Sequence, residues 1–216
     1  MSGIDDLMAA RNERWTEAMR RAKGIQDNGL GDAIRTYYTR YFPPILVVSV
    51  AVGSAVGALA FPDIAHDGRT LAGFGIALAA LSALIGGLIY NAKKVVPAAQ
   101  SGRIDVLISL EDDERKHVRR QIAGKAPLDT AHLPLIRAAA VQLRKNLATA
   151  LLVQPMMPLF FVPQALNFAA HGDSLFGWAM TVGAAVLLTG IGFLIRDFRR
   201  AGRFLMNTQQ PIGSES

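Results

Sequence analysis

The sequence contains no cysteine. This absence excludes disulfide bonds, thiolate nucleophiles and metal centres held by cysteine. Three signatures of catalysis are also missing: the phosphate-binding loop ending in Gly-Lys-Ser/Thr, the zinc-binding His-Glu-x-x-His and the nucleophile elbow Gly-x-Ser-x-Gly. We therefore expect a protein that is not an enzyme and that holds no cofactor.

Charged side chains are absent from four long stretches, which contain no Asp, Glu, Lys, Arg or His. These stretches are residues 43–61, 71–90, 148–166 and 175–195. A helix needs about 20 apolar residues to cross the hydrocarbon core of a bilayer, and a charge at its centre costs about 2.5 to 3.5 kcal/mol on the insertion scale. Helices buried in a soluble bundle, the alternative, normally keep one polar face. The sequence therefore predicts an all-α, polytopic membrane protein with four transmembrane helices.

Basic residues are almost absent from the two short loops within the first and the second pair of spans. All but one of the 23 Lys and Arg residues lie before the first span, between the second and third, or after the fourth, and the exception is Arg69. Because cytoplasmic segments of membrane proteins are enriched in Lys and Arg, we predict that both termini are cytoplasmic. The net charge of +6 then reflects topology, and we expect no nucleic-acid partner.

This topology divides the chain into five segments, which alternate between the cytoplasm and the membrane. They are a cytoplasmic N-terminal segment with an amphipathic helix (1–42), a first transmembrane hairpin (43–90), a cytoplasmic helical segment (91–147), a second transmembrane hairpin (148–195) and a basic cytoplasmic tail (196–216).

The amphipathic helix of the N-terminal segment spans residues 4–23, and glycines from Gly24 onward end it. Two placements are open for its apolar face. It lies on the inner membrane surface, with Trp15 at headgroup depth and its arginines on anionic lipid, or it packs against the other cytoplasmic helix.

The central segment predicts a helix that begins at Ser109. Ser109 is a good N-cap, and Asp112 stands three residues later, as in a variant capping box. Gly124 suits the position after the helix, where a left-handed backbone is common. A third helix begins near Thr130, accepts Pro134 in its first turn and continues toward the third span.

The two halves of the chain resemble each other around their short outer loops. Phe–Ala–His–Thr/Ser–Leu–Gly–aromatic strings recur, and so do Arg-Arg pairs followed by a glycine. The paired residues are Phe61, Ala65, His66, Thr70, Leu71, Gly73 and Phe74 with Phe168, Ala170, His171, Ser174, Leu175, Gly177 and Trp178, and Arg20, Arg21 and Gly24 with Arg119, Arg120 and Gly124. Because both halves start inside, the pattern indicates a parallel internal repeat about an axis along the membrane normal. Chance similarity of two helical hairpins is the alternative.

Small residues recur every four positions in three of the spans. They are Ser49, Gly53 and Gly57 in the first span, Ala79, Ala83 and Gly87 in the second, and Thr181, Ala185 and Thr189 in the fourth. Small residues let helix backbones approach closely in lipid. We interpret all three stripes as packing seams within the chain; a dimerisation face is the alternative.

The third span contains Pro155, Pro158 and Pro163, together with Gln154 and Gln164. Each proline removes an amide donor and frees a carbonyl. Freed carbonyls and glutamines line a cavity or a hinge in some transporters. No ionisable residue accompanies them here, so we favour a kinked helix whose freed groups are satisfied by neighbouring helices.

The short outer loops carry histidines and carboxylates that suit a divalent metal, but their spacing matches no metal-binding motif. They are Asp63, His66, Asp67, His171 and Asp173. We expect no metal, with Thr70 and Ser174 acting as helix N-caps and the other polar groups keeping the loops in water.

One stretch of the central segment resembles a helix–Gly–Pro–helix segment found beside the spans of small, uncharacterised four-span membrane proteins of high-GC bacteria. The residues that carry this resemblance are Leu110, Glu114, Arg115, Val118, Arg119, Ile122, Gly124, Pro127, Leu128, Asp129 and Leu133. The resemblance implies a bacterial inner membrane, and it implies no activity and no functional residues.

The functional hypothesis from the sequence is a non-enzymatic accessory or scaffolding subunit of an inner-membrane assembly. The alternative is a small oligomeric transporter or channel built from the parallel repeat. The expected partners are anionic lipids at the cytoplasmic face, and other membrane proteins or a second copy of the chain.

The topology can be tested with single cysteines, because the natural chain has none. We expect cysteines at Gly68 and Gly172 to react with an impermeant thiol reagent in intact cells. Cysteines at Gly102 and Ser214 are expected to react only after lysis. Protection of Gly172→Cys in intact cells would overturn the four-span arrangement.

Overall fold

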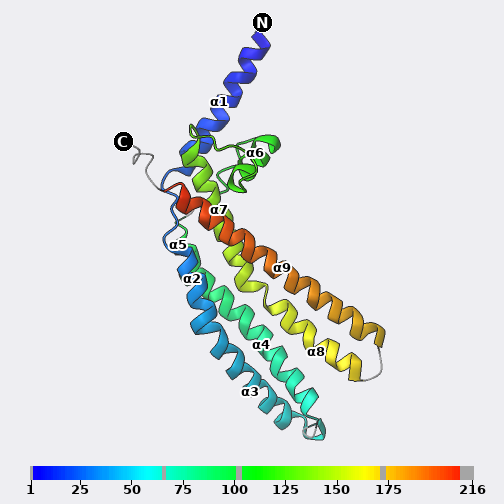
Figure 1. Cartoon of the computed structure of the whole chain (residues 1–216). Coiled ribbons are helices and arrows are strands. Elements are labelled where there is room, and N and C mark those ends of the chain that lie inside the picture. The colour runs from blue at the N-terminus through cyan, green and yellow to red at the C-terminus, as the bar shows by residue number, and fades with distance from the viewer. Residues whose placement is uncertain (1, 65–66, 101–103, 171–173, 210–216) are drawn as a thin grey trace. The chain divides into compact units, whose positions relative to one another are not determined.

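The structure is a computed structural model that describes residues 2–64, 67–100, 104–170 and 174–209 (Figure 1). Within these residues the chain is helical and contains no strand. Four helices are long and apolar enough to cross a membrane, namely Leu30–Ala60, Gly68–Ala98, Leu133–Ala165 and Leu175–Asn207. The four predicted spans coincide with these helices, which extend beyond the uncharged stretches into charged sequence.

The helices are subdivided by short changes in winding. The elements are α1 (Ser2–Ala22), α2 (Leu30–Thr36), the π-helix η1 (Tyr37–Tyr41), α3 (Phe42–Ala60), the 3-10 helix η2 (Pro62–Ile64), α4 (Gly68–Tyr90), the π-helix η3 (Asn91–Val95), α5 (Val96–Ala98), α6 (Asp112–Ile122), α7 (Leu133–Val153), α8 (Met156–Ala170) and α9 (Ser174–Asn207). The first two long helices thus contain π-helical segments, and the third is interrupted between α7 and α8.

The chain forms two compact units. One consists of residues 31–95 and 147–196 and contains the uncharged stretches, and we call it the apolar unit. The other, the polar unit, is assembled from the described parts of three separate segments, 1–30, 96–146 and 197–216. Helices α7 and α9 contribute residues to both.

In the apolar unit, α3 and α4 meet backbone to backbone. A Cβ atom added at Gly53 would lie 2.8 Å from Gly75 Cα, and one added at Gly75 would lie 2.6 Å from the Val50 carbonyl oxygen. The Ser54 hydroxyl donates to the Leu71 carbonyl across the same contact, at 3.0 Å. The small-residue stripe of the first span is therefore a packing seam within the chain, as predicted.

The stripe of the second span faces the third long helix. Ala79, Ala83 and Gly87 are buried, and a Cβ atom added at Gly87 would lie 2.5 Å from the Leu152 carbonyl oxygen. This prediction is also confirmed, since only a glycine allows α4 to come so close to that carbonyl.

The prediction for the fourth span is wrong within the described residues. Thr181, Ala185 and Thr189 are exposed, and the two threonine hydroxyls donate to carbonyls of their own helix, at 2.8 and 2.9 Å. Because these hydroxyls are already satisfied, they need no partner helix. α9 instead turns Gly183 toward α8, where an added Cβ would lie 3.1 Å from the Phe161 ring.

The break in the third long helix follows from Pro155. Proline has no N–H group, so the Leu151 carbonyl four residues earlier loses its helical donor. The Tyr38 hydroxyl, from η1, donates to this carbonyl. Inside the break, the Met157 N–H donates to the Gln154 carbonyl at 3.1 Å. At this proline the predicted kink with a satisfied carbonyl is confirmed.

The α3–α4 seam can be tested with two glycines of α4. Gly75→Ala places a Cβ against backbone, and such overpacking is expected to cost about 1–3 kcal/mol. Gly73→Ala is the matched control, because an added Cβ there meets nothing within 4 Å, and we expect it to stay within about 1 kcal/mol of the natural protein. Thermal unfolding in mild detergent measures both, and equal stability of the two variants would contradict the seam.

Candidate functional site

The polar unit has its own hydrophobic core, which joins all three of its segments. Ala18 of α1, Val118 of α6, Leu135 and Ile136 of α7 and Leu205 of α9 lie in it, each at most 5% exposed. The second half of α1 therefore packs against the other helices, which decides between the two placements left open by the sequence. The first turns of α1 extend beyond α6 (Figure 1).

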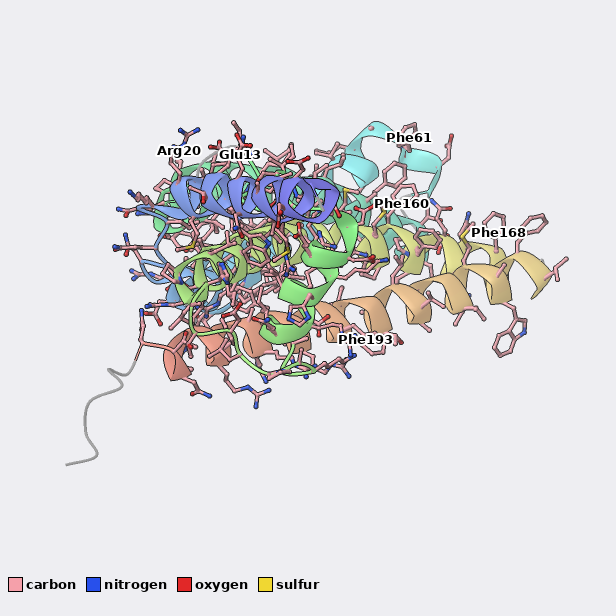
Figure 2. All side chains as sticks on the ribbon, turned by 90° about the horizontal axis from the view of Figure 1, so that it is seen from above. Glu13, Arg20, Phe61, Phe160, Phe168 and Phe193 are labelled. Carbon is pink, nitrogen blue, oxygen red and sulfur yellow. The ribbon has the colours of Figure 1, made fainter. Side chains whose placement is uncertain are left out.

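The outer face of α1 carries charge. Glu13 and Arg20 stand on this face (Figure 2), and the Arg20 side chain is 74% exposed although it pairs with Glu17. Ala18 and Ala22 of α1 are buried in the core, whereas Glu13 and Arg20 lie on the opposite, charged surface of the helix (Figure 2).

Helix α6 begins later than the sequence predicted. It starts at Asp112 with Glu111 as N-cap, and the Glu114 carboxylate returns to the Glu111 N–H at 3.0 Å, which completes a capping box. Ser109 is not the cap, because its hydroxyl donates to the Arg14 carbonyl of α1 at 3.3 Å. The hydrogen bond to α1, a segment distant in sequence, uses the Ser109 hydroxyl that would otherwise cap the helix.

The end of α6 is as predicted. Gly124 has a φ of +62°, and it follows the last helical turn in a Schellman arrangement. The Lys125 N–H donates to the Arg120 carbonyl at 2.8 Å, and the Gly124 N–H donates to the Gln121 carbonyl at 2.9 Å. Pro134 lies in the first turn of α7, again as predicted.

Trp15 links α1 to two other parts of the polar unit. Its indole N–H donates to Glu114 of α6 at 3.0 Å, and its ring centre lies 4.2 Å from that of His132, just before α7. His132 is paired in turn with Asp129 at 2.7 Å. The hydrogen bond from His132 lowers the pKa of Asp129, with the Ala131 N–H adding to this effect against a smaller effect of burial.

Arginines of α1 surround Glu114. Arg14 lies 3.6 Å and Arg11 lies 3.5 Å from the Glu114 carboxylate, and Arg14 also pairs with Glu111 at 3.0 Å. Burial by itself raises the pKa of Glu114, but the Glu111 N–H, the Trp15 indole and Arg14 together outweigh it, so the pKa is lowered. Glu114 is therefore an ionised anchor for α1.

A second polar contact joins the N-terminal connection to α7 and α9. One carboxylate oxygen of Asp27 accepts the N–H groups of Gly29 and Leu30, at 3.1 and 2.9 Å, at the start of α2. The other oxygen accepts a hydrogen bond from Arg144 of α7. The Asp27 and Arg144 side chains are only 9% and 16% exposed, so the two opposite charges neutralise each other where little water reaches them.

α9 completes the environment of Arg144. The guanidinium carbon lies 4.7 Å from the centre of the Phe198 ring, a cation–π distance. A Cβ atom added at Gly202 would lie 2.9 Å from that carbon. Sequence reasoning missed this contact; its one visible signal was Gly202, a glycine inside a helical stretch.

A cavity of about 450 Å³ opens beside these contacts. Its walls come from the end of α1 and the connection after it, from α7 and from the end of α9. The lining is mixed: Ala22, Val141 and Leu205 are apolar, Lys23 and Arg137 are basic, and Asp27 is acidic.

The described parts of the outer loops show no group of residues able to hold a metal. Asp63 and Asp67 are described, whereas His66, His171 and Asp173 lie outside the described residues. Asp67 is the N-cap of α4, in place of the predicted Thr70, and it accepts the Arg69 N–H at 3.1 Å and the Thr70 hydroxyl. The hydrogen bond from Thr70 lowers the pKa of Asp67. The Ser174 side chain also lies outside the described residues.

The Asp27–Arg144 pair is tested by removing one charge. Asp27→Asn keeps an oxygen for the two N–H groups but leaves Arg144 buried without a counter-charge, and such losses cost about 3–5 kcal/mol. Glu17→Gln, which breaks the two ion pairs of Glu17 with Arg20 and Arg21 along α1, is the control and should cost less than about 1 kcal/mol per pair. Chemical denaturation followed by circular dichroism measures both. A cost for Asp27→Asn no larger than the control would show that the pair does not hold the unit together.

Comparison of the chain with family models, with curated proteins and with solved structures finds no match.

Proposed function

We propose that this chain is an inner-membrane protein of bacterial type, with four transmembrane helices in two hairpins and with both termini in the cytoplasm. The main support is the set of segments that build the polar unit. This unit unites the N-terminal, central and C-terminal segments, which also carry nearly all Lys and Arg residues. Segments that share a core must lie on one side of the membrane, and an even number of spans is the arrangement that allows this.

We further propose that the protein is a non-enzymatic accessory or scaffolding subunit of a membrane assembly. The observation that carries this proposal is a polar unit built from three separate segments and fixed by the contacts of Trp15 and Arg144. In the apolar unit, the first three long helices are in close backbone contact at Gly53, Gly75 and Gly87, which favours a sealed bundle. A folded polar unit on the same chain as a sealed bundle suits the docking of other proteins.

A transporter or channel built from a parallel repeat is the second candidate. Gly24 and Gly124 both have positive φ, at +79° and +62°, shortly after a helix. This similarity supports a repeat. Within the described residues, the first half has no helix break at the position that corresponds to Pro155, so this break is where one copy of the repeat would have gained a separate function.

The scaffold proposal predicts a stoichiometric partner. The chain, extracted from bacterial membranes in mild detergent, is expected to elute with a partner protein at a fixed ratio. Removal of residues 2–13, which precede the core residues of α1, is expected to release that partner. The control Val186→Ala changes an exposed apolar side chain of α9 and should retain it. A chain that elutes alone and moves solutes in proteoliposomes would favour the transporter instead.

A further inference from the structure

The π-helix η1 packs against the last residue of α4, directly before the π-helix η3 begins. The ring of Tyr90, the last residue of α4, lies 5.0 Å from the Tyr37 ring and 5.5 Å from the Tyr41 ring, which stand at the two ends of η1. The Tyr90 hydroxyl also donates to the Ala33 carbonyl at 2.8 Å. π-helical turns are rare and frequently occur at functional sites. Here two of them lie at the same level, where each uncharged span adjoins charged sequence.

Three basic side chains project from these two segments. Arg40 belongs to η1, and Lys93 and Lys94 belong to η3, and all three are exposed. Within the described residues none of the three is paired with a carboxylate, whereas Arg14, Arg21, Arg115 and Arg144 of the polar unit all are.

Tyr41 is placed to act with these cations. It is 45% exposed, while the hydroxyls of Tyr37, Tyr38 and Tyr90 are occupied by backbone carbonyls. The Tyr41 hydroxyl has no such partner among the described residues, so it remains able to donate. Exposed tyrosines are typical of the headgroup level of membranes.

Exposed apolar side chains continue from the basic residues along the same helices. Leu88 and Ile89 lie about one turn before Lys93, and Val47 and Val48 lie about two turns after Arg40, with exposures of 49%, 51%, 69% and 60%. A ligand that fits this arrangement has an anionic head and long apolar chains.

We propose that η1 and η3 form a binding site for the headgroup of an anionic phospholipid, whose phosphate is held by Arg40, Lys93, Lys94 and the Tyr41 hydroxyl. Guanidinium, ammonium and phenol groups together supply charge-assisted hydrogen bonds to a phosphodiester. This site rests on the proposed membrane location. It adds to that proposal that one lipid molecule is bound at a defined place, in addition to any general attraction of anionic lipids to the basic segments. The acyl chains lie along the exposed faces of α3 and α4.

The test compares lipid retention by two variants that lose the same charge. The protein is reconstituted in vesicles of phosphatidylcholine with phosphatidylglycerol, extracted in mild detergent and analysed by native mass spectrometry for bound phosphatidylglycerol. The triple variant R40Q/K93Q/K94Q is expected to retain it on the order of 100-fold less tightly, at roughly tenfold or less per basic residue near a membrane surface. The control R119Q/R120Q/K125Q removes three exposed charges from α6 and its end and is expected to retain lipid like the natural chain.

Two further variants of the experiment distinguish a lipid site from misfolding and from a site for free phosphate. R40K/K93R/K94R keeps the charges and is expected to keep the lipid, which shows that loss in the first variant is not misfolding. Inorganic phosphate at the concentration of the lipid phosphate is expected not to displace it, and displacement would mean that the site binds free phosphate instead. Equal lipid loss in R40Q/K93Q/K94Q and in the control would overturn the site while leaving the membrane location intact. Failure of the natural chain to enter vesicles would overturn the membrane location itself.

Discussion

The cost of placing a charged side chain in apolar surroundings governs the organisation of this chain. At about 2.5 to 3.5 kcal/mol for each charge at the centre of a span, four uncharged stretches cannot accept the carboxylates and basic residues of the sequence. These charges lie in the connecting segments, and the segments then need partners for them. The polar unit provides these partners through contacts such as Asp27 with Arg144 and Trp15 with Glu114. Segregation of charge therefore produces a second folded unit in addition to the spans.

The same constraint acts on the backbone of the apolar unit. A carbonyl without a donor is costly where no water can replace the bond, and Pro155 creates one at Leu151. The Tyr38 hydroxyl satisfies it, and that hydroxyl comes from a π-helical segment, whose wider turn alters the direction of its side chains. The unusual winding of one helix thus compensates for the break in another, and small residues such as Gly87 let these helices come close enough to do so.

The sequence predicted features that depend on composition or on a single local rule. The four long helices follow from runs without charge, and the end of α6 follows from Gly124, because few other residues adopt a positive φ. Predictions failed where a distant contact competed with a local signal. Ser109 is a good N-cap, yet its hydroxyl is used by the Arg14 carbonyl, and Glu111 caps α6 in its place.

The interaction between Asp27 and Arg144 was beyond the reach of the sequence. The two residues are separated by 117 positions, and neither belongs to a recognisable motif. The stripe of Thr181, Ala185 and Thr189 failed for a related reason. Spacing identifies residues that share a face of a helix, but it does not indicate whether another helix covers that face.

Three separate segments form one cooperative polar unit. Hydrogen–deuterium exchange of the protein in proteoliposomes tests this cooperativity directly. An isolated helix as short as α6, with 11 residues, is only marginally stable in water, so its amides can be protected only by packing. We expect residues 112–122 to be protected in the natural chain and to lose this protection in Trp15→Ala, together with the second half of α1. Unchanged protection of α6 in that variant, or rapid exchange of α6 in the natural chain, would contradict this cooperativity.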